Sequence, residues 1–147
     1  MKKFAAVIVF LGAVFTLMFM YTAQQQKQEQ ALRATLPDVP AQGMITFINL
    51  GTASCLPCQM MDPILEELQE VYVDQVKIAF IDIGRHADQS QRFRITSIPT
   101  QIFFDHRGEE FFRHQGYMDK ASIVNVLEDL LSRQNTMTDS GSMSPQT

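Results

Sequence analysis

Hydrophobic and polar positions along the middle of the chain follow two periods, one of a strand and one of a helix. Short apolar or alternating runs predict four strands, at residues 44–50, 76–83, 101–105 and 109–114. Helical spacing of apolar residues predicts a long helix over 58–73, and a short polar helix is expected over 86–93. A last helix starts after Asp119, which can cap its N-terminus. Gly108 can take the left-handed turn position between the last two strands, which predicts a hairpin there.

The order of these elements, β-α-β-α-β-β-α, predicts the fold class. Strands that are joined by helices favour parallel pairing, whereas the hairpin gives an antiparallel edge. We therefore expect an α/β fold: a three-layer sandwich in which helices flank a mixed sheet of four to five strands.

The N-terminal 23 residues differ from the rest of the chain. Lys2 and Lys3 precede an uncharged, mostly apolar run over residues 4–23. A helix of about 20 such residues matches a bilayer core of about 30 Å. This predicts a signal anchor, or transmembrane segment, over 1–23, with the lysines in the cytoplasm and the rest on the periplasmic side. Cleavage after Ala23 is the alternative and would give a secreted or periplasmic protein, although Tyr21 occupies a position that favours small residues.

Two further segments lack the periodic pattern. Residues 24–40 are rich in Gln and contain two prolines, which predicts a linker, with a helical stretch possible over 27–34. Residues 134–147 are rich in Ser, Thr and Met, which predicts a disordered tail. One domain over 41–133 remains between them.

Composition and cysteine usage narrow the possible functions. The chain has 147 residues, a net charge of −4 and two cysteines. Nucleic-acid binding usually needs a basic face, so we expect no nucleic-acid partner. A disulfide between Cys55 and Cys58 would close a very short loop and constrain the unfolded chain little. The pair therefore indicates redox chemistry rather than a structural crosslink, and no cofactor beyond this disulfide is expected.

The position of the pair suggests a role for each cysteine. Cys55 lies where a loop enters the long helix, and the unpaired N–H groups of a helix N-terminus favour a thiolate. Cys58, one turn further on, should be less exposed. Cys55 is thus the expected nucleophile and Cys58 the resolving cysteine, while Pro57 suits the start of a helix.

Two alternatives remain for the pair. It could be half of a zinc site, but His86, His106 and His114 show no ligand spacing, so no metal is expected. It could also be an inert structural pair, although adjacent thiols outside the cytoplasm tend to oxidise.

The run CLPCQMMDPILEEL resembles the active-site helix of thioredoxins, including Pro63, which would kink that helix. Further along, Ile98, Pro99 and Thr100 resemble the cis-proline loop of the same family. The resemblance covers residues 41–133. It implies a thioredoxin-like fold and a thiol–disulfide oxidoreductase in which Pro99 is cis and faces the CxxC pair. It also implies that residues 98–100 bind substrate, with the Ile98 backbone pairing with an extended segment.

The chain also departs from the thioredoxin pattern. Ser54 stands where thioredoxins carry Trp, and Asn49 stands where they carry a buried Asp that relays protons. The Lys that pairs with this Asp aligns with Phe80. Both members of the ion pair are absent together, which avoids an unpaired buried charge.

The proton relay for Cys58 is therefore open. Asp82, near the end of a strand, is one candidate, although such a carboxylate often faces solvent. The acidic residues of the long helix, by contrast, are interpreted as a solvated face: Asp62, Glu66, Glu67 and Glu70.

These features together predict a reductase that exchanges disulfides with exported proteins and receives electrons from a membrane donor. A disulfide-donating oxidase or isomerase is the first alternative, because the motif does not set the direction of exchange. A non-catalytic binding module with a vestigial cysteine pair is the second.

Overall fold

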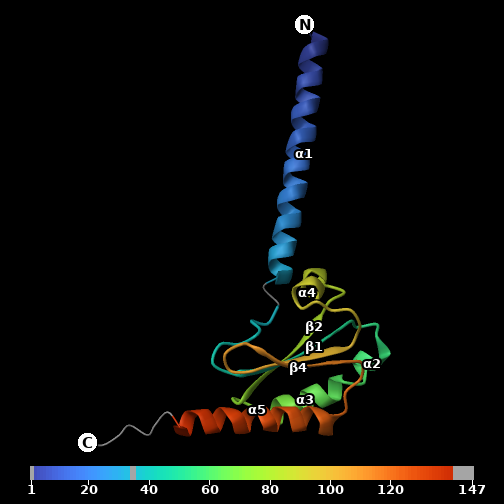
Figure 1. The fold of residues 1–147 in the computed structure, drawn as a ribbon. Coiled ribbons are helices and arrows are strands. Elements are labelled where there is room, and N and C mark those ends of the chain that lie inside the picture. Colours follow the sequence, from blue (N-terminus) through green and yellow to red (C-terminus); the bar gives the residue numbers. More distant parts are fainter. Residues whose placement is uncertain (1, 34–35, 141–147) are drawn as a thin grey trace, which may run out of the picture. The chain divides into compact units, whose positions relative to one another are not determined.

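The structure, a computed structural model, describes residues 2–33 and 36–140 (Figure 1). Side chains are described for residues 11–26 and 36–136. The chain divides into two compact units between residues 36 and 37.

The first unit is the helix α1 (Lys2–Arg33). Large apolar side chains on it are exposed between Leu11 and Tyr21. In the part of the chain that the structure describes, no helix is long and apolar enough to cross a membrane. The side chains of residues 1–10, where the expected membrane segment begins, lie outside the described residues. The helix also takes in residues 24–33 of the expected linker.

The second unit contains a mixed sheet. The strands are β1 (Ile45–Gly51), β2 (Val76–Asp82), β3 (Thr100–Phe104) and β4 (Glu110–Gln115). The helices are α2 (Leu56–Gln59), α3 (Asp62–Val71), α4 (Ala87–Arg92) and α5 (Lys120–Ser140). Among the described residues the strand order is β2-β1-β3-β4, with β1 parallel to β2 and antiparallel to β3, and β4 antiparallel to β3.

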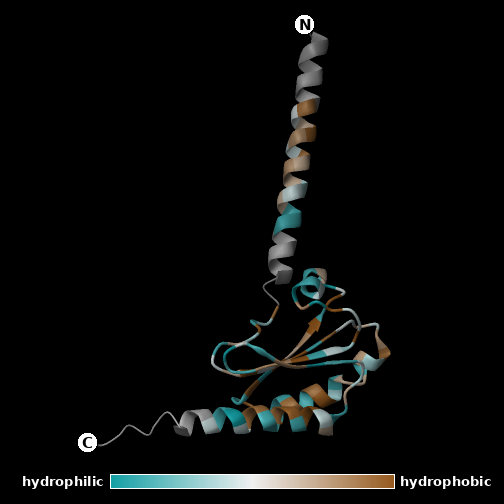
Figure 2. Ribbon diagram, viewed as in Figure 1, coloured by the Kyte–Doolittle hydropathy of each residue, from teal (hydrophilic) through white to brown (hydrophobic). Residues whose placement is uncertain are grey.

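Alternate residues of the strands face two different layers. Ile45 and Phe47 of β1 belong to one core cluster with Met61, which precedes α3, with Leu65 of α3 and with Leu127 of α5. On the other side of the sheet, Phe93 beside α4 contacts Phe104. Figure 1 shows α3 and α5 on one face of the sheet and α4 on the other. In Figure 2, α3 and α5 each contain both hydrophobic (brown) and hydrophilic (teal) residues, as expected of amphipathic helices. The expected sandwich of helices around a mixed sheet is therefore present.

Two details of the architecture differ from expectation. The helix expected over 58–73 is broken at Met60 and Met61 into α2 and α3. Pro63 explains the break, because it has no N–H to donate to the carbonyl of Gln59. In addition, β3 follows a helix, yet it pairs antiparallel with β1 rather than parallel with a neighbour.

The ends of the second unit also extend beyond the expected domain. Val39 is only 1% exposed, and its carbonyl accepts a 2.6 Å hydrogen bond from Arg92 Nη2, so this part of the expected linker packs onto the unit. At the other end, residues 134–140, which were expected in a disordered tail, continue α5. They contain no Gly or Pro to stop the helix, and Gly141 follows them. Residues 141–147 of the tail lie outside the described residues.

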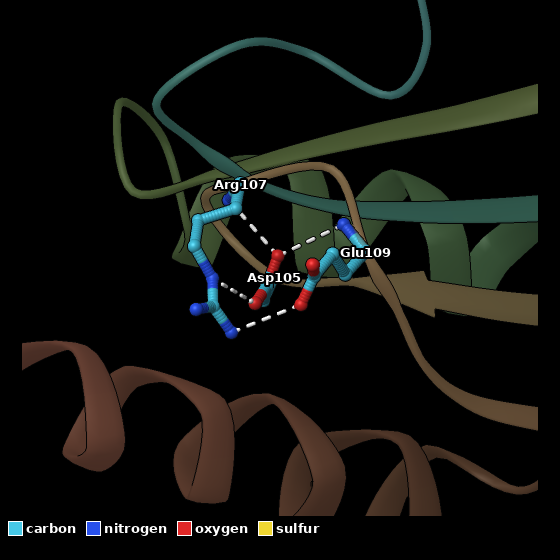
Figure 3. A network of polar contacts seen from close by, with 3 residues as sticks. All are labelled: Asp105, Arg107 and Glu109. Carbon is cyan, nitrogen blue, oxygen red and sulfur yellow. Dashed lines mark hydrogen bonds and ion pairs between the residues drawn. The ribbon is translucent and has the colours of Figure 1, made fainter.

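Local hydrogen bonds fix the turn between β3 and β4. Asp105 Oδ1 accepts bonds of 2.9 Å from the N–H groups of Arg107 and Glu109, and Oδ2 accepts one from Arg107 Nε (Figure 3). Arg107 also pairs with Glu109. Gly108 has a φ of +79°, as expected for the turn. Asp119 caps α5 as expected, through a bond from Ser122 N of 3.0 Å.

Candidate active site

A disulfide joins Cys55 and Cys58, whose Cα atoms are 5.2 Å apart. Cys55 is the N-cap of α2, and Pro57 lies in the first turn. The loop before α2 is held by Gln59, whose Nε2 donates to the carbonyl of Ala53 over 2.6 Å. This arrangement places the pair at the entry to a helix, where the sequence predicted it.

The two sulfur-bearing residues differ in accessibility. Cys55 is partly exposed, whereas Cys58 is only 1% exposed. An incoming disulfide can therefore reach Cys55, while Cys58 is shielded from large reactants. This asymmetry suits an attacking and a resolving cysteine.

The last residue of β1 makes room for Cys58. A Cβ placed on Gly51 would lie 2.7 Å from Cys58 Sγ and 3.4 Å from the Phe80 ring. Only glycine allows so close an approach of the strand to the sulfur. Sequence reasoning missed Gly51, although a glycine that ends a buried strand is a recognisable signal.

A buried pair of amides lies two residues earlier on the same face of β1. Asn49 and Gln101 are opposite each other on β1 and β3 and are fully buried. Gln101 Nε2 donates to Asn49 Oδ1 over 3.0 Å, and it also lies 3.0 Å from Met61 Sδ. Asn49 Nδ2 and Gln101 Oε1 are buried without a hydrogen-bond partner among the described residues. Gln101 was not anticipated as part of this site; its signal is a polar residue at the start of an apolar strand.

The strand register places Phe80 opposite Asn49. These are the two positions where the resemblance placed a missing Lys and Asp, so the structure brings them together as expected. An amide and an aromatic ring replace an ion pair there, and neither titrates. The replacement leaves this pair of positions uncharged.

The loop before β3 contains a cis peptide bond between Ile98 and Pro99, as the resemblance implied. Thr100 pairs with Leu50, which places Pro99 near the end of β1 where Cys58 packs against Gly51. Thr100 Oγ1 donates to the Ser97 carbonyl over 2.6 Å, and Gly116 N donates to the Pro99 carbonyl over 2.7 Å. These bonds fix the loop from both sides. Ile98 is partly exposed.

A cleft of about 380 Å³ opens beside Cys58. Its lining combines the loop after β1 with α2, α3 and β2: Thr52, Ala53, Cys58, Gln59, Asp62 and Phe80. Asp82 is absent from this lining. Its Oδ1 instead accepts a bond from Gly84 N of 2.9 Å, and Arg85 lies 3.8 Å from Oδ2. The carboxylate suggested as a proton relay thus belongs to the turn after β2.

Comparisons with known proteins agree with this geometry. The family model Thioredoxin matches residues 21–129. A thioredoxin of Alicyclobacillus acidocaldarius is 34% identical over 85 residues, which cover 58% of this chain and 80% of that protein. A thioredoxin of Chlamydia caviae is 37% identical over 83 residues, covering 56% and 79%. One of Mycobacterium tuberculosis is 28% identical over 98 residues, covering 67% and 84%.

The family match extends over more than half of the chain and includes the disulfide, the broken helix and the cis-proline loop. Thiol–disulfide exchange is the chemistry that a CxxC pair on this fold supports. The chain belongs to the thioredoxin family, and it is a thiol–disulfide oxidoreductase whose reactive pair is Cys55 and Cys58.

Proposed function

We propose that this protein reduces disulfides in exported proteins while anchored on the extracytoplasmic side of a bacterial membrane. The observation that carries the dithiol–disulfide cycle is the difference in exposure between Cys55 and Cys58 within a single helical turn. The reductase direction is supported by the similarity to thioredoxins. A reductase needs an accessible nucleophile and a shielded second thiol that releases the substrate intramolecularly.

The proposed cycle begins with both cysteines reduced. The Cys55 thiolate attacks a substrate disulfide, forms a mixed disulfide and releases one substrate thiolate. Cys58 then attacks Cys55 Sγ, which forms the Cys55–Cys58 disulfide and releases the second substrate thiolate. Two electrons pass from the protein dithiol to the substrate. The cis-proline loop, with Ile98, Pro99 and Thr100, is the proposed surface for the extended substrate segment.

The proposed location is supported by the N-terminal sequence. Lys2 and Lys3 precede the apolar run over 4–23, and the apolar side chains of α1 that are described are exposed to solvent. Apolar side chains left exposed along a helix indicate that something apolar covers them, and a bilayer would do so. Reduction outside the cytoplasm consumes electrons, so a membrane protein that donates electrons to the Cys55–Cys58 disulfide is the implied partner.

The direction of exchange is tested by the reduction potential of the full-length protein, measured by equilibration with a glutathione buffer. We expect a value near the reducing end of the family scale, about −270 mV. A value near about −120 mV would contradict the reductase role and favour a disulfide-donating oxidase. An intermediate value, near about −180 mV, would favour an isomerase.

The location is tested by fractionation and protease accessibility. We expect the full-length protein to stay in the membrane pellet after alkaline carbonate extraction, and its C-terminal unit to be cut by protease added to spheroplasts. Recovery of the intact chain in the cytosolic fraction would contradict the proposed anchor. A shortened chain in the periplasm would show that the segment is a cleaved signal.

A further inference from the structure

We propose that Asp62 exchanges the proton of Cys58, through solvent in the cleft that the two residues line. This inference rests on the proposed function, because it assigns a residue to the step in which Cys58 resolves the mixed disulfide.

Among the described strand residues around Gly51, the register offers one carboxylate, Asp82, and its Oδ1 is held by the hydrogen bond from Gly84 N. Gly51 contributes no side chain there. Asn49, its hydrogen-bonded partner Gln101 and Phe80 do not titrate, and they lie on the neighbouring strands β1, β3 and β2. The solvent-filled cleft on the other side of Cys58 is therefore the proposed route for its proton.

The cleft supplies the route. Apart from Cys58, Asp62 is the one titratable residue in its lining; Thr52, Ala53, Gln59 and Phe80 carry no charge. Cys58 and Asp62 are four residues apart on consecutive turns, and Asp62 is the first residue of α3. Its carboxylate is exposed, so water in the cleft can contact both side chains. One bridging water would link the thiol to the carboxylate.

The other charged groups near the cleft are engaged elsewhere or lie outside the lining. Asp82, at the end of β2, accepts the hydrogen bond from Gly84 N. Glu66 follows Asp62 by one turn of α3 but does not line the cleft. Glu67 pairs with Lys120 of the α5 start.

The break between α2 and α3 matters to this arrangement. Because α2 ends at Gln59 and a new helix starts at Asp62, this residue lines the cleft together with Cys58 and Phe80. The acidic group that the family resemblance places on the strand beneath Cys58 is thus replaced by one on the helix beside it.

The proposed step conserves protons and electrons. In the mixed disulfide, Cys58 loses its proton through water to the Asp62 carboxylate, and its thiolate attacks Cys55 Sγ. The Cys55–Cys58 bond forms while the bond from Cys55 to the substrate breaks. The electron pair of that bond leaves on the substrate sulfur, which takes a proton from solvent, and Asp62 returns its proton to water.

The test separates the two sulfur steps with one chromogenic disulfide. Reduced full-length protein is mixed with one equivalent of dithiobis(nitrobenzoate). The first thionitrobenzoate released reports attack by Cys55, and the second reports resolution by Cys58. The variants are Asp62→Asn and Asp62→Ala, with Asp82→Asn and Glu66→Gln as matched controls that also remove one carboxylate each.

We expect both Asp62 variants to slow the second release at least about tenfold near pH 7 and to leave the first release unchanged. The deficit should shrink steadily as pH is raised, because hydroxide then removes the thiol proton without help from a carboxylate. Added acetate should partly restore the Asp62→Ala rate, which a merely structural defect would not allow. The controls should match the wild type in both releases.

If the wild type releases both thionitrobenzoates and Asp62→Asn releases the second one at the same rate, the role of Asp62 is overturned and the proposed function still stands. A deficit in Asp62→Asn that persisted at high pH would equally overturn it, since the cause would then be structural. A wild type that released no thionitrobenzoate at all would instead overturn the proposed function.

Discussion

The sulfur of Cys58 occupies the space that a side chain on Gly51 would need: a Cβ there would lie 2.7 Å from Sγ. The end of β1 can therefore approach the start of α2 this closely only because residue 51 has no side chain. Because Cys58 is buried within the short helix α2, its side chain has little room to move away from an added Cβ.

We expect Gly51→Ala to destabilise the protein by about 1–3 kcal/mol, the usual cost of overpacking a core. Urea unfolding under reducing conditions measures this change. The control is the same substitution in a Cys58→Ala background, where the sulfur is gone and a smaller loss is expected. Equal losses in the two backgrounds would show that the contact with the sulfur is not the cause.

Because Asn49 is buried, a charged side chain at position 49 should destabilise the protein. Asn49→Asp places a carboxyl opposite Phe80, where burial raises its pKa above the ordinary value of about 3.9. A raised pKa in the folded state means that stability is lost as pH rises through that value. We expect a loss of about 3 kcal/mol at pH 7 and a smaller one near pH 4, measured by urea unfolding.

Two variants check this interpretation. Asn125→Asp, on the exposed surface of α5, should change stability by less than about 0.5 kcal/mol. Adding Phe80→Lys to Asn49→Asp should recover part of the loss, because the register pairs these positions. No coupling between the two substitutions would contradict the placement.

Asp105, in the hairpin turn between β3 and β4, should contribute to stability with a pH dependence opposite to that of Asn49→Asp. Burial would raise the pKa of Asp105, but the hydrogen bonds from Glu109 N and from Arg107 outweigh it, so the pKa is lowered. A carboxyl whose pKa is lowered in the folded state stabilises the protein at pH values above the pKa of the unfolded state, and this stabilisation is lost as pH falls. Asp105→Asn should therefore cost about 1 kcal/mol at pH 7, and the difference from wild type should shrink below about pH 4. A difference that did not vary with pH, or that matched the surface control Asp74→Asn, would contradict this role.

Much of the fold could be predicted from the sequence because its periods are regular. Every expected strand of the second unit is present, and no strand end differs from its expected position by more than one residue. The direction of β3 was not predictable from local pattern, since a helix before a strand favours parallel pairing but does not require it. The extension of α5 to Ser140 was missed because polar composition was interpreted as disorder, although nothing in that segment stops a helix.

The site was predictable where a residue's position is set by neighbours in sequence, as for Cys55, Cys58 and Pro57 at the start of α2. It was not predictable where a role depends on contacts across the sheet. Gln101 supports Asn49 only because β1 and β3 place them opposite each other. Asp62 was interpreted as part of a solvated helix face, and only the fold shows that it shares a cleft with Cys58.

Catalysis of disulfide exchange by Cys55 and Cys58 can be measured by the reduction of insulin. Full-length wild type, Cys55→Ser and Cys58→Ser are compared with dithiothreitol as the electron source, and precipitation of the freed insulin chain is followed. Catalysis by this pair predicts rapid precipitation with the wild type, a background rate with Cys55→Ser, and stalling of Cys58→Ser as a mixed disulfide with insulin. Equal rates for the wild type and Cys55→Ser would contradict it.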